Sequence, residues 1–127
     1  MTPEETKVAR AFVACGRWRW MPGMMTEGWR LTCVSLHDGA WSATSTLAHR
    51  EYHYPTLPDI TDPATLGCIL QVVRDAHGVQ WLTTVPLMTA GGVHGWLIRG
   101  LDTPVCKSEA EALLRALQAA PQYIQEI

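Results

Sequence analysis

The sequence predicts a single α+β domain, in which three helices pack on one antiparallel sheet built from two hairpins. Three observations support this fold class. The chain has 127 residues, enough for one domain and too few for two ordinary ones. Residues 57–78 contain a helix whose start, buried side and end can all be identified. A helix followed by a hairpin pattern occurs twice, and hairpins favour antiparallel pairing beside segregated helices.

The helix within residues 57–78 has recognisable signals at both ends. Asp62 suits the capping position and Pro63 the first helical position, where no N–H is needed. Gly78 suits the residue after the end, where a left-handed conformation is favourable. The less polar side of this helix spans about 200°, wider than in a surface helix. We therefore expect it to be central, touching a sheet and another element. Its most apolar positions are Leu66, Ile69, Leu70 and Val73.

Two further helices are predicted near the ends of the chain. Thr2 and Glu5 have the spacing of a capping box, and Ser108 and Glu111 repeat it. Both pairs precede apolar residues at helical spacing, which indicates one buried side for each helix. The predicted helices cover residues 2–15 and 108–120.

The remaining segments are predicted to form strands. Trp18 and Trp20 alternate with Arg17 and Arg19, as in a short strand with one apolar face. Asp38-Gly39 is a strong signal for a hairpin turn. The other predicted strands are 29–36, 41–47, an edge strand at 50–54, and 79–85 and 93–99, joined by a glycine-containing loop at 87–92.

Composition restricts the classes of function. Hydrophobic residues make up 47% of the chain and charged residues 17%, a low charged share that fits a surface hidden in a partner or a homo-oligomer. A net charge of −2 argues against a dominant nucleic-acid role, which needs a clustered positive field. Four dispersed cysteines and the absence of a signal-peptide pattern predict reduced thiols in a cytoplasm. No apolar run approaches the ~20 residues of a membrane span.

Two strings in the sequence resemble a known family. WRWMPGM at residues 18–24 and PDITDPATLGCILQVVRDAHG at residues 58–78 are similar to segments of short proteins from tailed bacteriophages and prophages. The alanine- and leucine-rich segment at residues 108–121 is similar as well. The resemblance covers about a third of the chain. It implies a phage origin and a host-cell cytoplasm, and it names no catalytic residue and no cofactor.

The strongest binding candidates are Arg17, Trp18, Arg19 and Trp20, with Arg30 close in sequence. Alternating arginine and tryptophan is suited to anchoring a protein partner, because these residues dominate interface hot spots. The same side chains can contact phosphates and stack on bases. A third interpretation is structural: the tryptophans enter the core and the arginines face water.

A weaker candidate is a metal site at His49, Glu51 and His53. In a strand these three side chains share one face, because side chains repeat every two residues, and His and Glu are zinc ligands. A solvated edge strand is the favoured interpretation. Cys68 lies on the apolar side of the predicted central helix, which indicates a buried, inert thiol.

No recognisable active-site motif is present. The leading hypothesis is a non-enzymatic phage accessory protein that binds another protein, for example to inhibit a host defence system or host enzyme. A nucleic-acid-binding accessory factor is the first alternative. A small metal- or thiol-dependent enzyme is the second.

Overall fold

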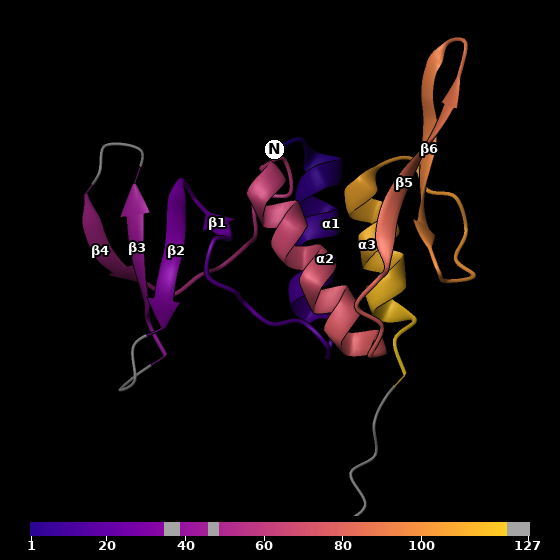
Figure 1. Cartoon of the computed structure of the whole chain (residues 1–127). Coiled ribbons are helices and arrows are strands. Elements are labelled where there is room, and N and C mark those ends of the chain that lie inside the picture. Colours follow the sequence, from indigo (N-terminus) through magenta and orange to yellow (C-terminus); the bar gives the residue numbers. More distant parts are fainter. Residues whose placement is uncertain (35–38, 46–48, 122–127) are drawn as a thin grey trace, which may run out of the picture.

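Three helices lie at the centre of the molecule, with β-structure on either side (Figure 1). The computed structural model describes residues 1–34, 39–45 and 49–121. Its helices are α1 (Pro3–Ala14), α2 (Pro63–His77) and α3 (Glu109–Gln118). The α+β class and the order of helices and hairpins are confirmed. The strands form two separate antiparallel sheets, however, where the sequence predicted one.

The first sheet has four antiparallel strands in the order of the sequence. Its strands are β1 (Met25–Thr26), β2 (Trp29–Val34), β3 (Trp41–Ser45) and β4 (Arg50–His53). Figure 1 shows β1 nearest the helices and β4 farthest from them. The predicted edge strand is confirmed as β4, whereas β1 was not predicted. Asp38 and the predicted continuations to residues 36 and 47 lie outside the described residues.

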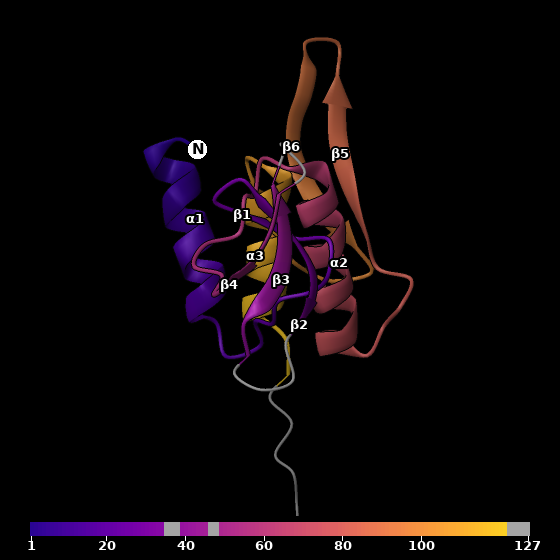
Figure 2. The same cartoon turned by 90° about the vertical axis from the view of Figure 1, so that its left-hand side faces the viewer.

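The second sheet is a hairpin of β5 (Thr83–Thr89) and β6 (Gly92–Arg99), and its position corrects the prediction. Residues 79–82 are not a strand, because Leu82 is buried and its carbonyl accepts a hydrogen bond from Arg74 of α2 at 2.8 Å. Residues 87–92 are not an open loop either, since both strands extend almost to the glycine turn. The hairpin projects beyond the ends of the helices in both views (Figures 1 and 2).

The helix boundaries follow the capping residues that the sequence indicated. Thr2 and Glu5 form the complete capping box of α1. Asp62 caps α2, which ends at Gly78 in a left-handed conformation with φ of 69°. The Ser108 hydroxyl accepts the Glu111 N–H at the start of α3. These local signals therefore determine where each helix begins and, for α2, where it ends.

The most enclosed helix is α3, whereas the apolar pattern predicted that α2 would be the central helix. It packs against α1, α2, β5 and β6. Its alanines allow several elements to approach it closely, and an apolar surface on most sides is typical of a buried helix. The His77 side chain of α2 is hydrogen bonded to the Ala116 carbonyl at 2.7 Å. The buried residues of α3 are Ala110, Ala112, Leu113, Leu114, Ala116 and Leu117.

Two glycines should respond oppositely to alanine. A Cβ at Gly95 would lie 2.6 Å from Val105 Cγ1 and 3.0 Å from the Cys106 carbonyl oxygen, because Cys106 bridges to Trp96 there. Gly67 lies exposed in α2 with open space around it. We expect Gly95→Ala to lower the free energy of unfolding by about 1–3 kcal/mol. We expect Gly67→Ala to raise it by roughly 1 kcal/mol.

Urea unfolding followed by circular dichroism checks both substitutions against the wild type. A stabilising Gly95→Ala would contradict the close approach of the Cys106 segment to β6.

Candidate functional site

Residues 16–24 do not form the predicted strand; they cross the helices as an irregular segment between α1 and β1. The reason lies in long-range packing. Trp18 contacts Phe12 of α1 with ring centroids 5.6 Å apart, and Trp20 meets Trp18 edge-to-face at 5.3 Å. Both tryptophans pack against the core while remaining partly exposed. The Trp18 indole N–H is buried without an acceptor among the described residues, so packing alone holds this ring.

Arg19 points away from the tryptophans toward α2. Its guanidinium forms an ion pair with Asp75. Gln71 and Gln80 also donate hydrogen bonds to Asp75, each at 2.8 Å. Hydrogen bonds from Gln80 and Gln71, together with the Arg19 charge, lower the pKa of Asp75. Because Arg19 and Asp75 are both well exposed, the pair contributes little to stability. It does fix the segment on α2 and neutralises the arginine.

Arg30 is more deeply engaged. Its guanidinium donates two hydrogen bonds to the Asp62 carboxylate, at 2.6 and 3.2 Å, and one to the Gly23 carbonyl at 2.9 Å. Two-pronged pairs of this kind are stronger and more directional than single contacts. The hydrogen bonds to Asp62 raise the pKa of Arg30 and, reciprocally, lower the pKa of Asp62. Arg30 therefore connects β2 to the start of α2.

Thr65 completes this connection on the buried side. Its backbone N–H and its hydroxyl both donate to Asp62, at 3.0 and 2.7 Å. The same hydroxyl accepts the N–H of Met25 in β1 at 2.9 Å. Thr65 is fully buried, so each of these polar groups needs its partner. We call Arg30, Asp62, Thr65 and Met25 the sheet–helix joint.

Residues 18–24 and residues 58–78 meet beside the sheet–helix joint. Gly23 has a φ of 97°, and a Cβ there would lie 3.3 Å from Cys68 Sγ. The Cys68 thiol donates to the Pro22 carbonyl at 3.4 Å. Burial raises the pKa of Cys68, which keeps the thiol protonated and unreactive. These contacts hold residues 18–24 against α2.

The candidate metal residues are only partly brought together. His53 Nε2 lies 3.4 Å from Glu51 Oε2. The His53 ring packs on Trp29, with ring centroids 4.1 Å apart. His49 precedes β4, where its backbone pairs with Ser45. Within residues 1–34, 39–45 and 49–121, no cluster of three or more His, Cys, Asp or Glu side chains is arranged to hold a metal ion.

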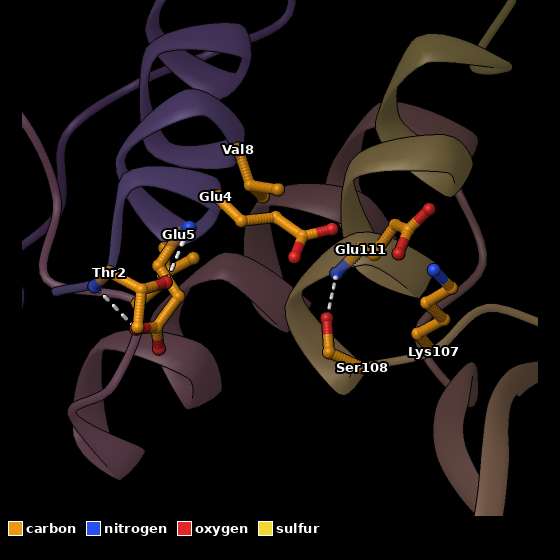
Figure 3. Close-up of a pocket in the computed structure, with 8 residues that line it drawn as sticks. Thr2, Glu4, Glu5, Val8, Lys107, Ser108 and Glu111 are labelled. Carbon is orange, nitrogen blue, oxygen red and sulfur yellow. Dashed lines mark hydrogen bonds between the residues drawn. The ribbon is translucent and has the colours of Figure 1, made fainter.

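A hollow between the N-terminal ends of α1 and α3 carries several carboxylates. Figure 3 shows Glu4 directed from α1 toward α3, with Glu111 and Lys107 on the opposite side. Glu5 is occupied by the α1 capping box, and Ser108 by the cap of α3. Lys107 balances part of the negative charge. The hollow exists because the N-terminal ends of α1 and α3 lie next to each other.

The surface that sequence reasoning missed is the end of the β5–β6 hairpin. We call residues 87–93 the arm. Met88 and Val93 lie opposite each other in the arm, and their side chains are 66% and 53% exposed. Because residues 87–92 were predicted to be a loop, the pairing of Met88 with Val93 was not predicted. No alternation of polar and apolar residues marks this pair, because Val85, Pro86, Leu87 and Met88 are four consecutive apolar residues.

Comparison of the chain with models of protein families, with curated proteins and with solved structures gives no match. Across the described part of the chain, every helix is too short or too polar to cross a membrane.

The sheet–helix joint should be important for stability. Arg30→Ala removes three hydrogen bonds and leaves the partly buried Asp62 without its cation. We expect the free energy of unfolding to fall by about 2 kcal/mol or more, because hydrogen bonds to charged groups are the stronger class. Arg30→Lys should recover only part of the loss, since lysine lacks the two-pronged geometry. Urea unfolding measures both; equal stability of all three proteins would contradict this role.

The sheet–helix joint should also give a defined pH dependence. Because the folded-state pKa of Asp62 lies below its ordinary value, ionised Asp62 stabilises the fold above the unfolded-state pKa. That contribution is lost as pH falls below about 4 and passes through the folded-state pKa. Unfolding measured across this range should show a shallower dependence on pH for Asp62→Asn. Identical slopes for Asp62→Asn and the wild type would refute the assignment.

Proposed function

We propose that the protein acts by binding another protein, and that the arm makes the principal contact. The observation that carries this proposal is the exposed Met88–Val93 pair on a hairpin that extends beyond the helices. In the phage setting implied by the resemblance, the partner is a host enzyme or host defence protein in the cytoplasm, and binding inhibits it.

The base of the hairpin defines which face of the arm is apolar. Thr84 and Ile98 are paired across β5 and β6. The Thr84 hydroxyl donates to Glu109 of α3 at 3.0 Å, and Ile98 is buried. This face of the hairpin therefore packs against α3. Directly opposed residues share a face, and the face repeats every second residue along each strand.

The same face continues past the helices. Pro86 and Trp96 form the next pair on it, and Met88 continues it two residues further along β5. The register shifts by one residue between Leu87 and Met88, which brings Val93 opposite Met88 in place of His94. The stripe thus runs from the core at Ile98 to open surface in the arm. A two-stranded ribbon has little stability by itself. A partner with an apolar patch would extend the packing that α3 supplies at the base.

The partner is expected to contact the face of the arm and not its free edge. Trp96 exchanges both backbone hydrogen bonds with Cys106, so its N–H and carbonyl point away from β5. In antiparallel pairing, the opposing Pro86 then directs its backbone to the outer edge. Proline has no N–H to donate there, which prevents strand addition.

The arginine–tryptophan segment is a weaker candidate than the sequence indicated. Arg19 and Arg30 each face a carboxylate, which reduces the positive field that nucleic acid requires. Part of the surface of Trp18 and Trp20 is covered by the core and by the contact between the two rings. These contacts favour protein binding through the arm over nucleic-acid binding through this segment.

Affinity measurements on variants of the arm test the proposal. A protein retained from nuclease-treated bacterial host lysate at near-equal stoichiometry is identified, purified and titrated by calorimetry. We expect Met88→Ser with Val93→Ser to weaken binding at least tenfold, because apolar anchors dominate interface energetics. The matched control, Val13→Ser, changes an exposed apolar residue at the end of α1 and should bind normally.

Two results would overturn the assignment. One is unchanged affinity of the arm double variant. The other is loss of binding in a folded Trp18→Ala, Arg19→Ala variant alone, which would return the site to the arginine–tryptophan segment. Retention of nucleic acid with a steep salt dependence would instead favour the nucleic-acid alternative.

A further inference from the structure

We propose that Met88 is an oxidation site, at which a peroxide converts the exposed thioether to a sulfoxide before it reaches the methionines near the core. The modification follows from the position of Met88 alone. Its consequence, weaker binding of a partner, rests on the proposed function of the arm. The inference starts from the methionines of the chain, which differ strongly in their exposure to solvent.

The five methionines lie in different environments. Met24 is fully buried, and its sulfur accepts a hydrogen bond from the Met21 N–H at 3.4 Å. Met21 and Met25 are themselves partly buried. Met88 in the arm and Met1 at the start of the chain are exposed. Because the susceptibility of a sulfur to oxidation follows its exposure, Met88 is the reactive methionine within the β-structure.

The arm leaves the Met88 thioether open to solvent. Met88 is the second-last residue of β5, next to the turn at residues 90–91. Thr89, Ala90 and Val93 around it are exposed as well. The hairpin extends beyond the helices at this end, so α3 does not cover the arm as it covers the base (Figures 1 and 2). A dissolved oxidant can therefore approach the sulfur directly.

The reaction transfers one oxygen atom to Met88. A lone pair of Sδ attacks one oxygen of hydrogen peroxide, so that a sulfur–oxygen bond forms and the oxygen–oxygen bond breaks. The other oxygen leaves as hydroxide and takes the proton of the transferred oxygen, which gives water. The sulfur is oxidised by two electrons and the peroxide is reduced by two. The product is a polar sulfoxide, which sulfoxide reductases convert back to the thioether.

Oxidation of Met88 should change the arm and leave the fold intact. Met88 lies outside the hydrophobic core, whereas a sulfoxide at Met24 would place a polar group inside it. In the arm, the sulfoxide replaces one member of the apolar Met88–Val93 pair by a polar side chain. The oxidised protein is therefore expected to be folded and to bind its partner more weakly.

Cysteines are the competing sulfur groups. Burial raises the pKa of Cys68 and that of Cys106, which keeps these thiols protonated and slow to react. Cys33 is exposed, so its oxidation has to be separated from that of Met88. The variant Met88→Leu makes this separation, because it keeps all four cysteines and an apolar side chain in the arm but has no sulfur there.

Peptide mapping by mass spectrometry, after brief treatment with dilute hydrogen peroxide, tests the site. Trypsin cleaves after Arg74 and Arg99, and the peptide between them contains Met88 as its one methionine. The tryptic peptide at residues 20–30 contains the three methionines that are partly or fully buried. We expect fragment spectra to locate an added oxygen on Met88 several times faster than on residues 20–30.

Retention on a phenyl column measures the apolar surface of the arm without any partner. Oxidised wild type should elute earlier than reduced wild type, and sulfoxide reductases with dithiothreitol should restore its retention. Peroxide should shift the retention of Met88→Leu much less. Circular dichroism verifies that each oxidised protein is folded.

Calorimetry with the partner protein identified by capture tests the consequence for binding. Oxidised wild type should bind roughly tenfold more weakly than reduced wild type, because an apolar anchor is lost. Peroxide-treated Met88→Leu should bind like the untreated variant.

Equal rates of oxidation at Met88 and at residues 20–30 would overturn the assignment of the site. Unchanged retention of protein oxidised at Met88 would overturn the change in the arm. Unchanged affinity after oxidation, with weak binding by the Met88→Ser, Val93→Ser variant, would overturn the effect on binding and leave the proposed function intact. Normal binding by that double variant would overturn the proposed function and the effect on binding together.

Discussion

The rest of the structure depends on the hydrogen bonds that the Asp62 carboxylate accepts. It caps α2 through Thr65 and binds the Arg30 guanidinium at the same time. The Thr65 hydroxyl also accepts a hydrogen bond from the Met25 N–H, which connects Asp62 to β1. Leu31 and Ala43 of the four-stranded sheet are buried in the same hydrophobic cluster as residues of the helices, so apolar packing and the Asp62 hydrogen bonds together hold the sheet beside them. A helix cap, which normally stabilises one element, here also connects a sheet to the helices.

The segment before β1 follows from the same constraint. To bring Met25 to Thr65, the chain must leave α1 and cross α2. Trp18 and Trp20 fill the surface beside Phe12, and Arg19 reaches Asp75. Gly23 then turns the chain closely past Cys68, where a side chain would crowd the thiol. The distinctive composition of this segment is therefore explained by its route over the helices. Its tryptophans already pack against other residues of the protein, which leaves less of their surface for a ligand.

Local signals were sufficient for the helices because caps involve residues three positions apart. Long-range partners were not predictable in this way. Arg19 and Asp75 are 56 residues apart in sequence, and Arg30 and Asp62 are 32 apart. Both arginines therefore resembled free binding groups. Alternating residues 17–20 also match a strand, but in the described part of the chain no strand lies beside them to pair with them. The separation into two sheets depends on α3 lying between the hairpin and the rest, which only the assembled fold determines.

The two exposed β-elements differ in the kind of contact that each one permits. Backbone pairing is available wherever an edge has outward N–H groups, and it discriminates little between sequences unless side chains add selectivity. At β5 the outward group belongs to Pro86, so the arm is left with its apolar face. At β4, no proline interrupts the residues that pair with β3, and Arg50 and Tyr52 keep their N–H groups. Pro86 thus leaves the side-chain face of the hairpin as the surface on which the proposed partner protein can pack.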